Sequence, residues 1–227
     1  MPGNAVWDAY ADGSFKAESM TAKPLDYAYT HALPTWDHSI ILPPIIRAVR
    51  SIPPDGAVLD IGCGNGAMLA EIRRLGSWKL CGLDSSESAV AMARGQGFDV
   101  RLADATIDSA ALFKPHTFDL IISAEVIEHV YDPRGFLRQA HSLLRPQGRL
   151  VLTTPYHGYL KNLLIALLGK FDSHVNPLWD CGHIKFWSRA TLSAALVEAG
   201  FHRIEFYGAG RCPYLWKSMV LTATAQP

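Results

Sequence analysis

The sequence predicts an α/β domain built on a doubly wound, largely parallel sheet. Short apolar runs typical of buried strands alternate with segments that have helical periodicity. Residues 58–61 form one such run, which leads into a glycine-rich turn and then a helix, as in βαβ units. The chain has 227 residues, of which 49% are hydrophobic, enough for one sizeable core.

The first fifth of the chain is predicted to precede the sheet. Residues 1–36 are irregular and rich in aromatic residues, so they can form either a cap or a surface arm. Residues 37–51 have helical spacing of isoleucine and leucine despite two prolines. The Pro-Pro-Asp-Gly segment at 53–56 indicates a turn into the first strand. We therefore divide the chain into a segment 1–51 and a domain 52–227.

The turn after the first strand reads Asp-Ile-Gly-Cys-Gly-Asn-Gly over residues 60–66. Alternate glycines let the backbone pass close to a bulky ligand, and the helix that follows offers free N–H groups. The spacing G-x-G-x-G differs from the G-x-G-x-x-G of dinucleotide folds. The preceding carboxylate of Asp60 would repel a diphosphate but attract an ammonium group. The turn therefore indicates a nucleotide-type cofactor with an ammonium, such as S-adenosylmethionine.

Three more predicted strands end in residues suited to such a cofactor. Residues 79–84 form the second strand, and Asp84 lies 18 residues past Gly66, about the distance at which a carboxylate reaches a ribose diol. Residues 98–105 form the third strand, which ends near Asp104, and residues 117–125 form the fourth.

These four motifs, over residues 57–130, resemble those of the class I S-adenosylmethionine-dependent methyltransferases. The resemblance implies a Rossmann-like, seven-stranded sheet of strand order 3-2-1-4-5-7-6, with the last two strands as an antiparallel hairpin at its edge. It favours a cap for residues 1–36 and places Asp104 beside the adenine. The glycine spacing argues against another doubly wound nucleotide binder. The predicted cofactor-binding residues are Asp60, Gly62, Cys63, Gly64, Asn65, Gly66, Asp84, Ser85, Asp104, Ala105 and Ala124.

The remaining elements complete the alternation of strands and helices. Ser85 or Ser86 can cap the helix after the second strand. The other predicted elements are a helix over 133–145, a fifth strand over 148–154, an insert over 156–187 with an apolar helix at 159–169, a helix from Ser188, and strands over 203–207 and 217–223.

The fourth strand runs directly into Glu125-Val126-Ile127-Glu128-His129. In a helical turn, positions i, i+3 and i+4 share one face, so the two glutamates and the histidine would converge. A further histidine follows at 183. The two segments resemble ubiquinone-pathway catechol O-methyltransferases and small-RNA 2′-O-methyltransferases, in which Glu-x-x-Glu-His and a later histidine hold a divalent metal. The resemblance implies the metal ligands Glu125, Glu128, His129 and His183.

Such a ligand set suits Mn²⁺, Zn²⁺ or Co²⁺ and, less ideally, Mg²⁺. The metal would bind adjacent substrate hydroxyls and lower their pKa. The alternative is a site without metal, in which His129 or His183 is the catalytic general base. The glutamates would then cap a helix or pair with Arg134 or Arg138.

The expected function is therefore S-adenosylmethionine-dependent O-methylation of a small molecule, such as a phenol or catechol, with or without a metal. N- or C-methylation, a carboxylate acceptor, a nucleic-acid 2′-hydroxyl and a catalytically silent cofactor-binding protein remain alternatives. The 21 Lys and Arg residues balance the 21 Asp and Glu residues, which argues against nucleic acid as a partner.

The sequence also bears on location and partners. The four cysteines lack paired ligand spacing, which indicates reduced thiols, and no secretory signal or transmembrane-length segment is visible. We therefore expect a cytoplasmic protein. The apolar helix at 159–168 can touch a membrane surface, although only Lys161 and Lys170 provide nearby basic charge. A homodimer is compatible with the sequence.

Overall fold

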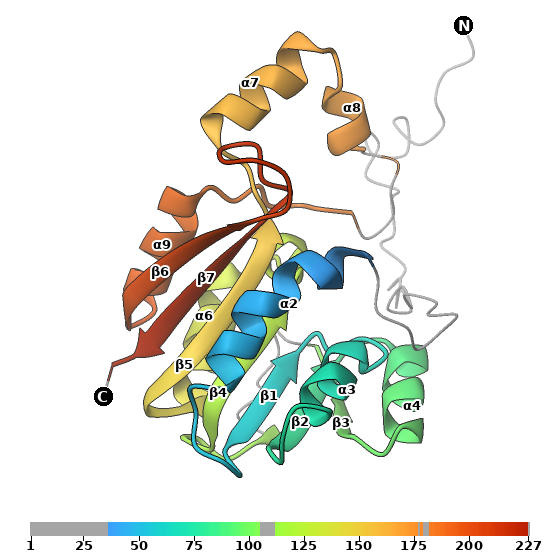
Figure 1. Ribbon diagram of the computed structural model, residues 1–227, viewed down its shortest axis with the longest axis vertical. Coiled ribbons are helices and arrows are strands. Elements are labelled where there is room, and N and C mark those ends of the chain that lie inside the picture. The colour runs from blue at the N-terminus through green and yellow to red at the C-terminus, as the bar shows by residue number, and fades with distance from the viewer. Residues whose placement is uncertain (1–35, 105–111, 177, 179–181, 227) are drawn as a thin grey trace, which may run out of the picture.

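The computed structural model describes residues 36–104, 112–176, 178 and 182–226. Seven strands form one sheet in the order β3-β2-β1-β4-β5-β7-β6, which confirms the predicted fold and strand order (Figure 1). Strand β7 is antiparallel to both β5 and β6, whereas the other neighbours are parallel. Residues 1–35 of the predicted cap 1–36, together with Ala105 and Cys181, lie outside the described residues, whereas Trp36 begins α2.

The five parallel strands end at one edge of the sheet, where the glycine turn and the end of β4 lie. Their common direction brings together residues that are far apart in sequence. The strands are β1 Ala57–Ile61, β2 Lys79–Asp84, β3 Asp99–Leu102, β4 Phe118–Ala124, β5 Leu144–Pro155, β6 Phe201–Ala209 and β7 Ser218–Ala225.

Helices cover both faces of the sheet. Helices α2 and α3 contact each other on one face, and α6 and α9 contact each other on the opposite face, while α7 and α8 stand beyond the edge where the parallel strands end (Figure 1). The helices are α2 Trp36–Val49, α3 Ala67–Arg73, α4 Glu87–Gly95, the 3₁₀ helix η1 Ile127–His129, α6 Pro133–Leu143, α7 Tyr159–Leu167, α8 Phe171–His174 and α9 Arg189–Glu198.

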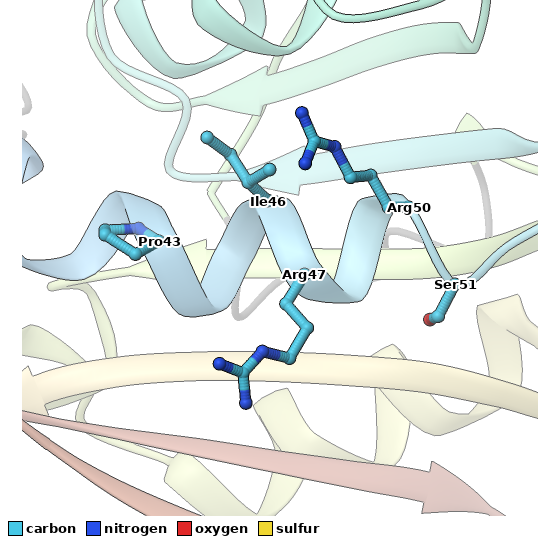
Figure 2. A pocket seen from close by; sticks show the side chains of 5 residues that line it. All are labelled: Pro43, Ile46, Arg47, Arg50 and Ser51. Atoms are coloured by element: carbon cyan, nitrogen blue, oxygen red, sulfur yellow. The ribbon is translucent and has the colours of Figure 1, made fainter.

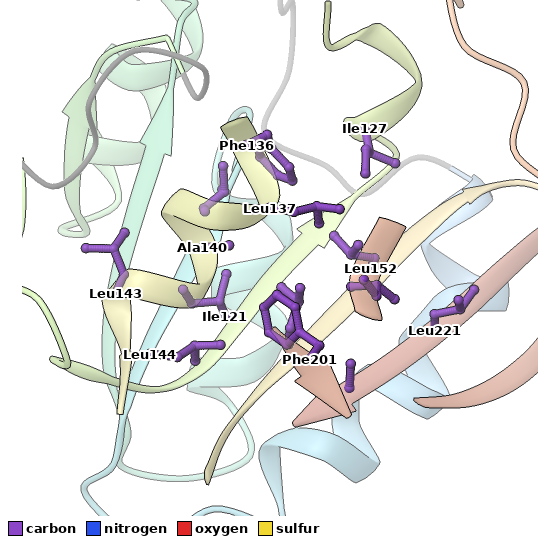
Figure 3. Close-up of a cluster of buried hydrophobic side chains, with 14 of the residues drawn as sticks. Ile121, Ile127, Phe136, Leu137, Ala140, Leu143, Leu144, Leu152, Phe201 and Leu221 are labelled. Atoms are coloured by element: carbon purple, nitrogen blue, oxygen red, sulfur yellow. The ribbon is translucent and has the colours of Figure 1, made fainter. Parts of the chain in front are cut away.

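Buried side chains on β4 show why both faces need a helical layer. Ile121 belongs to the cluster beneath α6 and α9, with Phe136 and Phe201 (Figure 3). Ile122 is the next residue along the strand and belongs to the cluster beneath α2, with Ile45. Successive strand residues point to opposite faces, so β4 is buried on both sides, as in a doubly wound sheet.

Polar caps explain where several helices begin. The Ser86 hydroxyl accepts a hydrogen bond from the Ala89 backbone N–H and starts α4, which resolves the choice between Ser85 and Ser86. Ser188 starts α9 as predicted, through a reciprocal capping box with Thr191.

Some boundaries differ from the expected ones. Strand β3 ends at Leu102, before Asp104, and β5 begins at Leu144, immediately after α6. The β6–β7 pairing shifts register between His202 and Glu205, where Arg203 has a φ of 49°. Within the described ranges, no helix combines the length and the apolar character needed to cross a bilayer.

Candidate active site

The glycine turn is attached to the end of β2 by backbone hydrogen bonds. The N–H groups of Gly62 and Cys63 both donate to the Leu83 carbonyl, at 2.7 and 3.1 Å. Gly62 has a φ of 77°, and a Cβ at this position would overlap the Val126 side chain. Only glycine therefore fits between the turn and the segment that follows β4.

Asp60 is buried directly beneath this turn, with 1% of its surface exposed. Its Oδ1 atom has no hydrogen-bonding partner among the described residues. Burial, and secondarily the charge of Asp84, raises the pKa of Asp60 to about 7. A buried carboxylate oxygen without a partner is costly unless a ligand supplies one, so Asp60 fits the ammonium group of the expected cofactor.

Asp84 supports the turn through both carboxylate oxygens. Oδ2 accepts from the Gly64 N–H at 2.8 Å, and Oδ1 accepts from the Ser86 N–H at 2.9 Å. Each carboxylate oxygen can accept more than one hydrogen bond, so these contacts are compatible with ribose binding. Ser85 lies exposed between these residues.

The other predicted cofactor residues lie along the same strand ends. Asn65 is buried, and its side-chain oxygen accepts from the Ala67 N–H at 3.1 Å, while Gly66 is the N-cap of α3 with a φ of 82°. Cys63 is buried, and this burial is the main cause of the raised pKa of its thiol. Asp104 is exposed beyond β3, and Ala124 is half-buried at the end of β4.

Glu128, His129 and His183 form a group of potential metal ligands. One ligand atom from each residue lies within 4.8 Å of the others. The Nε2 atoms of His129 and His183 are each 4.0 Å from Glu128 Oε1. His129 and Glu128 lie in η1, whereas His183 comes from the insert after β5. The fold therefore joins two segments that are distant in sequence.

The Glu128 carboxylate is the most unusual member of this group. The residue is 1% exposed, and neither of its oxygens forms a hydrogen bond of normal geometry among the described residues, although the Thr154 side chain lies near enough to lower its pKa. Burial, and secondarily the charge of Glu125, raises the pKa of Glu128 to about 8. A bound divalent cation would compensate the charge of this buried carboxylate, so the donor set fits such an ion.

Each of the two imidazoles can offer a ring nitrogen to a metal. His129 Nδ1 lies 3.2 Å from the Gly182 carbonyl oxygen, and when Nδ1 donates there, Nε2 keeps its lone pair. Burial, followed by the charges of His129 and His157, lowers the pKa of His183 to about 4. His183 is therefore uncharged at neutral pH, the form that binds metals.

Backbone contacts attach the His183 segment to η1. The N–H groups of Ile184 and Lys185 both donate to the Glu128 carbonyl, each at 2.9 Å. The Trp187 Nε1–H donates to the Ile127 carbonyl at 3.4 Å. Sequence reasoning missed these contacts, since their only visible signal was a histidine near an aromatic run.

Glu125 does not join the three-residue group. Its φ is 57°, its N–H donates to the Thr153 carbonyl at 3.1 Å, and its Oε1 accepts from the Thr153 hydroxyl at 2.8 Å. The expected face was based on a helical turn over residues 125–129, but the turn is a 3₁₀ helix that begins only at Ile127. The spacing argument therefore does not apply to Glu125, and Thr153 is a neighbour that the sequence did not reveal.

The predicted alternative, in which a glutamate pairs with Arg134, receives no support, because Arg134 forms an ion pair with Glu198 at 2.7 Å.

The structure also contains a hollow of about 330 Å³ on the outer side of α2 (Figure 2). None of the predicted site residues lines it, so it is separate from the site at the strand ends. The lining residues are Pro43, Ile46, Arg47, Arg50 and Ser51.

The strand order, the glycine turn and the two acidic residues beside it define a Rossmann-like protein of the S-adenosylmethionine-binding class. The protein family described as "Methyltransferase domain" matches residues 35–205. The chain therefore belongs to the methyltransferase domain family, whose cofactor is S-adenosylmethionine.

Curated relatives have related sequences. The chain is 40% identical over 174 residues to the Ubiquinone biosynthesis O-methyltransferase of Parvibaculum lavamentivorans, covering 74% of this chain and 66% of that protein. It is 35% identical over 155 residues to the protein of the same name from Xanthomonas euvesicatoria, covering 66% of this chain and 64% of that protein. The matched region thus spans slightly less than two thirds of either relative.

Solved structures share the fold at low sequence identity. A SAM-dependent methyltransferase from Archaeoglobus fulgidus has a TM-score of 0.64 at 17% identity, covering 81% of this chain and 91% of that chain. The [4+2]-cyclase SpnF has a TM-score of 0.66 at 15% identity, covering 89% and 87%. Since the same fold carries different names, the function must be argued from the site.

Proposed function

We propose that this protein transfers a methyl group from S-adenosylmethionine to a hydroxyl oxygen of a small molecule, and that a divalent metal assists the transfer. One observation carries the proposal. The Glu128, His129 and His183 group begins two residues after Val126, and Val126 packs against Gly62 of the glycine turn. Potential metal ligands therefore adjoin the cofactor turn.

The cofactor would be held by the residues around this turn. Asp60 would accept from its ammonium group, Asp84 from its ribose hydroxyls, and the turn would lie against its amino-acid end. When bound, the cofactor supplies a methyl group already activated on a sulfonium. The protein must align an acceptor oxygen and exclude water.

The metal would be held by Glu128, His129 and His183, while Glu125 is held at Oε1 by the Thr153 hydroxyl. When bound, a divalent ion lowers the pKa of a hydroxyl that it binds. Gly182 fixes the orientation of His129, and the backbone N–H groups of Ile184 and Lys185 fix that of the Glu128 backbone.

A general base without metal is the second candidate. A base works best when its pKa lies near the working pH, and the lowered pKa of His183 disfavours that residue. His129 is the remaining candidate, and Glu128, whose Oε1 lies 4.0 Å from His129 Nε2, would then stabilise the protonated imidazole instead of binding a metal.

The acceptor class follows from charge and from the relatives. The zero net charge gives no general attraction to nucleic acid, and the curated relatives are named as O-methyltransferases of ubiquinone biosynthesis. A phenol or catechol is therefore the favoured acceptor. Three described cysteines are free thiols, which supports a reducing compartment such as the cytoplasm.

The first experiment separates donor binding from metal binding. Calorimetric titration should show S-adenosylhomocysteine binding to the wild type and to Glu128→Gln alike. Mn²⁺ or Zn²⁺ should bind the wild type but at least tenfold more weakly to Glu128→Gln and His183→Ala. His174→Ala, an exposed histidine of the same insert, is the matched control and should bind metal normally. Failure to bind S-adenosylhomocysteine would contradict the methyltransferase proposal itself.

The second experiment measures methyl transfer to a panel of catechols and phenols. Chelation should abolish turnover, and adding Mn²⁺ or Zn²⁺ should restore it. Turnover that persists after complete metal removal would favour the general-base alternative, whereas transfer only to amines or carbon would contradict O-methylation.

A further inference from the structure

His157 is a half-buried histidine close to the metal-ligand group, and the proposed methyl transfer gives it no role so far. It comes two residues after the end of β5, at the carboxyl edge of the sheet. Its charge helps to lower the pKa of His183, so the two imidazoles are near each other. The group formed by Glu128, His129 and His183 does not include it. His157 is therefore placed to contact a molecule bound at that group rather than the metal itself.

The segment that carries His183 also fixes the backbone of His157. The His157 N–H donates to the Trp187 carbonyl at 3.1 Å, and the Trp187 Nε1–H donates to the Ile127 carbonyl of η1 at 3.4 Å. The His157 ring meets the Phe186 ring edge to face, with centroids 5.1 Å apart and an angle of 85° between the planes. The fold thus sets the position of this imidazole relative to η1 and to His183.

The first turn of α7 sets the hydrogen-bonding pattern of the His157 ring. Its Nδ1 lies 3.3 Å from Asn162 Oδ1, and since an amide oxygen only accepts, Nδ1 carries the proton in this contact. Asn162 follows Lys161, the one buried residue of α7. Lys161 Nζ donates to the Tyr156 carbonyl at 2.8 Å and to the Lys217 carbonyl at 3.3 Å, which attaches this turn to the ends of β5 and β7. With Nδ1 as the donor, Nε2 of His157 keeps its lone pair.

The surroundings favour the uncharged form of this ring. Burial, followed by the charge of Lys161, lowers the pKa of His157, although the contact with Asn162 acts in the opposite direction. The charge of His174 in α8 lowers this pKa further. At neutral pH the imidazole therefore offers Nε2 as a hydrogen-bond acceptor, and a hydroxyl is a suitable donor to it.

We propose that His157 contacts the methyl acceptor, and that its Nε2 accepts a hydrogen bond from a hydroxyl outside the pair that the metal-ligand group binds. This inference rests on the proposed function. It makes His157 a specificity-determining residue, which favours acceptors with three adjacent hydroxyls over those with two. A site built to accept a hydrogen bond from a hydroxyl discriminates against an analogue that lacks it, because the acceptor atom is then left unpaired.

Two replacements separate contact with the acceptor from a purely structural role of His157. An asparagine amide reaches about as far as Nδ1, so His157→Asn keeps the contact with Asn162 and has no group at Nε2. A glutamine amide reaches about as far as Nε2, so His157→Gln keeps a hydrogen-bond acceptor there. If His157 contacts the acceptor, glutamine should preserve acceptor binding and asparagine should not. The reverse pattern would show that His157 only supports α7, and would overturn the proposal.

Calorimetric titration with catechol and with pyrogallol, which has one more adjacent hydroxyl, measures this contact directly. In the presence of S-adenosylhomocysteine and Mn²⁺, and without oxygen, the wild type should bind pyrogallol about tenfold more tightly than catechol. His157→Asn should bind the two equally, and His157→Gln should keep most of the preference. His116→Asn is the matched control and should behave as the wild type. Nδ1 of His116 also contacts a carbonyl, that of Leu144 at 2.9 Å, but His116 precedes β4 at the opposite edge of the sheet.

Methyl transfer to pyrogallol provides a second readout. His157→Asn should raise KM for pyrogallol about tenfold with little change in kcat, since the hydrogen bond is made equally before and during the transfer. Equal affinity of the wild type for catechol and pyrogallol would overturn the proposal, and so would weaker binding of S-adenosylhomocysteine and Mn²⁺ by His157→Asn. Failure of the proposed function would instead appear as absent methyl transfer by the wild type to either compound, and the titration would still decide the role of His157.

Discussion

Two buried carboxylates, Asp60 and Glu128, have oxygens without partners in the described structure, and both lie at the carboxyl edge. Such groups cost stability in the unliganded protein because their charged forms lose hydration. At these two residues, a carboxylate that suits ligand binding lowers the stability of the unliganded protein.

The stability of the unliganded protein should depend on pH through Asp60. Burial raises the pKa of this carboxyl from its ordinary value of 3.8 to about 7 in the folded protein, so the folded state binds the proton more tightly than the unfolded state. The stabilising contribution is therefore present below about pH 4 and is lost as pH rises to about 7, by at most roughly 4 kcal/mol. Asp60→Asn should lack this decline in urea unfolding between pH 4 and pH 8, and should bind S-adenosylhomocysteine more weakly. Parallel pH profiles for the wild type and the variant would rule out this role.

Gly62→Ala should damage the turn through Val126. We expect a loss of about 1–3 kcal/mol in the free energy of unfolding, from the positive φ and from the overlap together, and weaker donor binding. Gly97→Ala is the matched control, since its φ of 83° imposes similar strain but its added Cβ meets nothing within 4 Å. Equal losses of stability in the two variants would show that contact with Val126 is unimportant.

At the scale of elements, η1 and the insert form a single unit joined by hydrogen bonds to the backbone carbonyls of η1. Residues Ile127 and Glu128 provide carbonyls, and Ile184, Lys185 and Trp187 provide donors. A ligand held by both segments would strengthen this attachment, because binding to the folded state alone favours that state.

Metal binding should therefore slow hydrogen exchange in residues 182–187. We expect saturating Mn²⁺ or Zn²⁺ to protect the Ile184 and Lys185 amides at least tenfold more, and chelation to reverse this, as measured by exchange and mass spectrometry. The amides of α6, the next helix along the chain, serve as the internal reference. Unchanged hydrogen exchange at Ile184 and Lys185 with bound metal would exclude a metal that joins η1 to residues 182–187.

Some elements of the site were predictable from sequence, and others were not. The turn at 60–66 and the acid at the end of β2 were predictable, because their positions depend on the spacing of residues along a short stretch of the chain. The position of Glu125 was not predictable, because the 3₁₀ turn starts two residues later and the carboxylate meets Thr153 on the neighbouring strand. Contacts between strands depend on register, which spacing along one segment does not define.

At the scale of the whole molecule, the order of strands and helices was predictable. Short apolar runs typical of strands and apolar residues at helical spacing are both clear over residues 57–155. The orientation of α7 was not, since its apolar sequence is compatible with burial as well as with contact with a membrane surface. Lys161 decides the orientation through carbonyls at the ends of β5 and β7, a contact that exists only in the assembled sheet.

Donor binding should stabilise the whole domain. S-adenosylhomocysteine at 100 times its dissociation constant should add about 2.7 kcal/mol to the free energy of unfolding. For a chain of this size we expect the midpoint of thermal unfolding to rise by roughly 5–10 °C, increasing with ligand concentration. Adenosine at the same concentration, which lacks the ammonium, should bind more weakly and therefore give a smaller shift. Equal shifts with the two ligands would remove Asp60 from donor recognition.

The shifted register of β6 has a consequence for self-association. At Arg203 the outermost strand interrupts its regular ladder, and at the opposite margin β3 has only four residues, with charged Asp99 and Arg101. Bulges, brevity and charge all hinder an incoming strand from continuing a sheet. Both margins of the folded sheet therefore disfavour edge-to-edge pairing with a second chain.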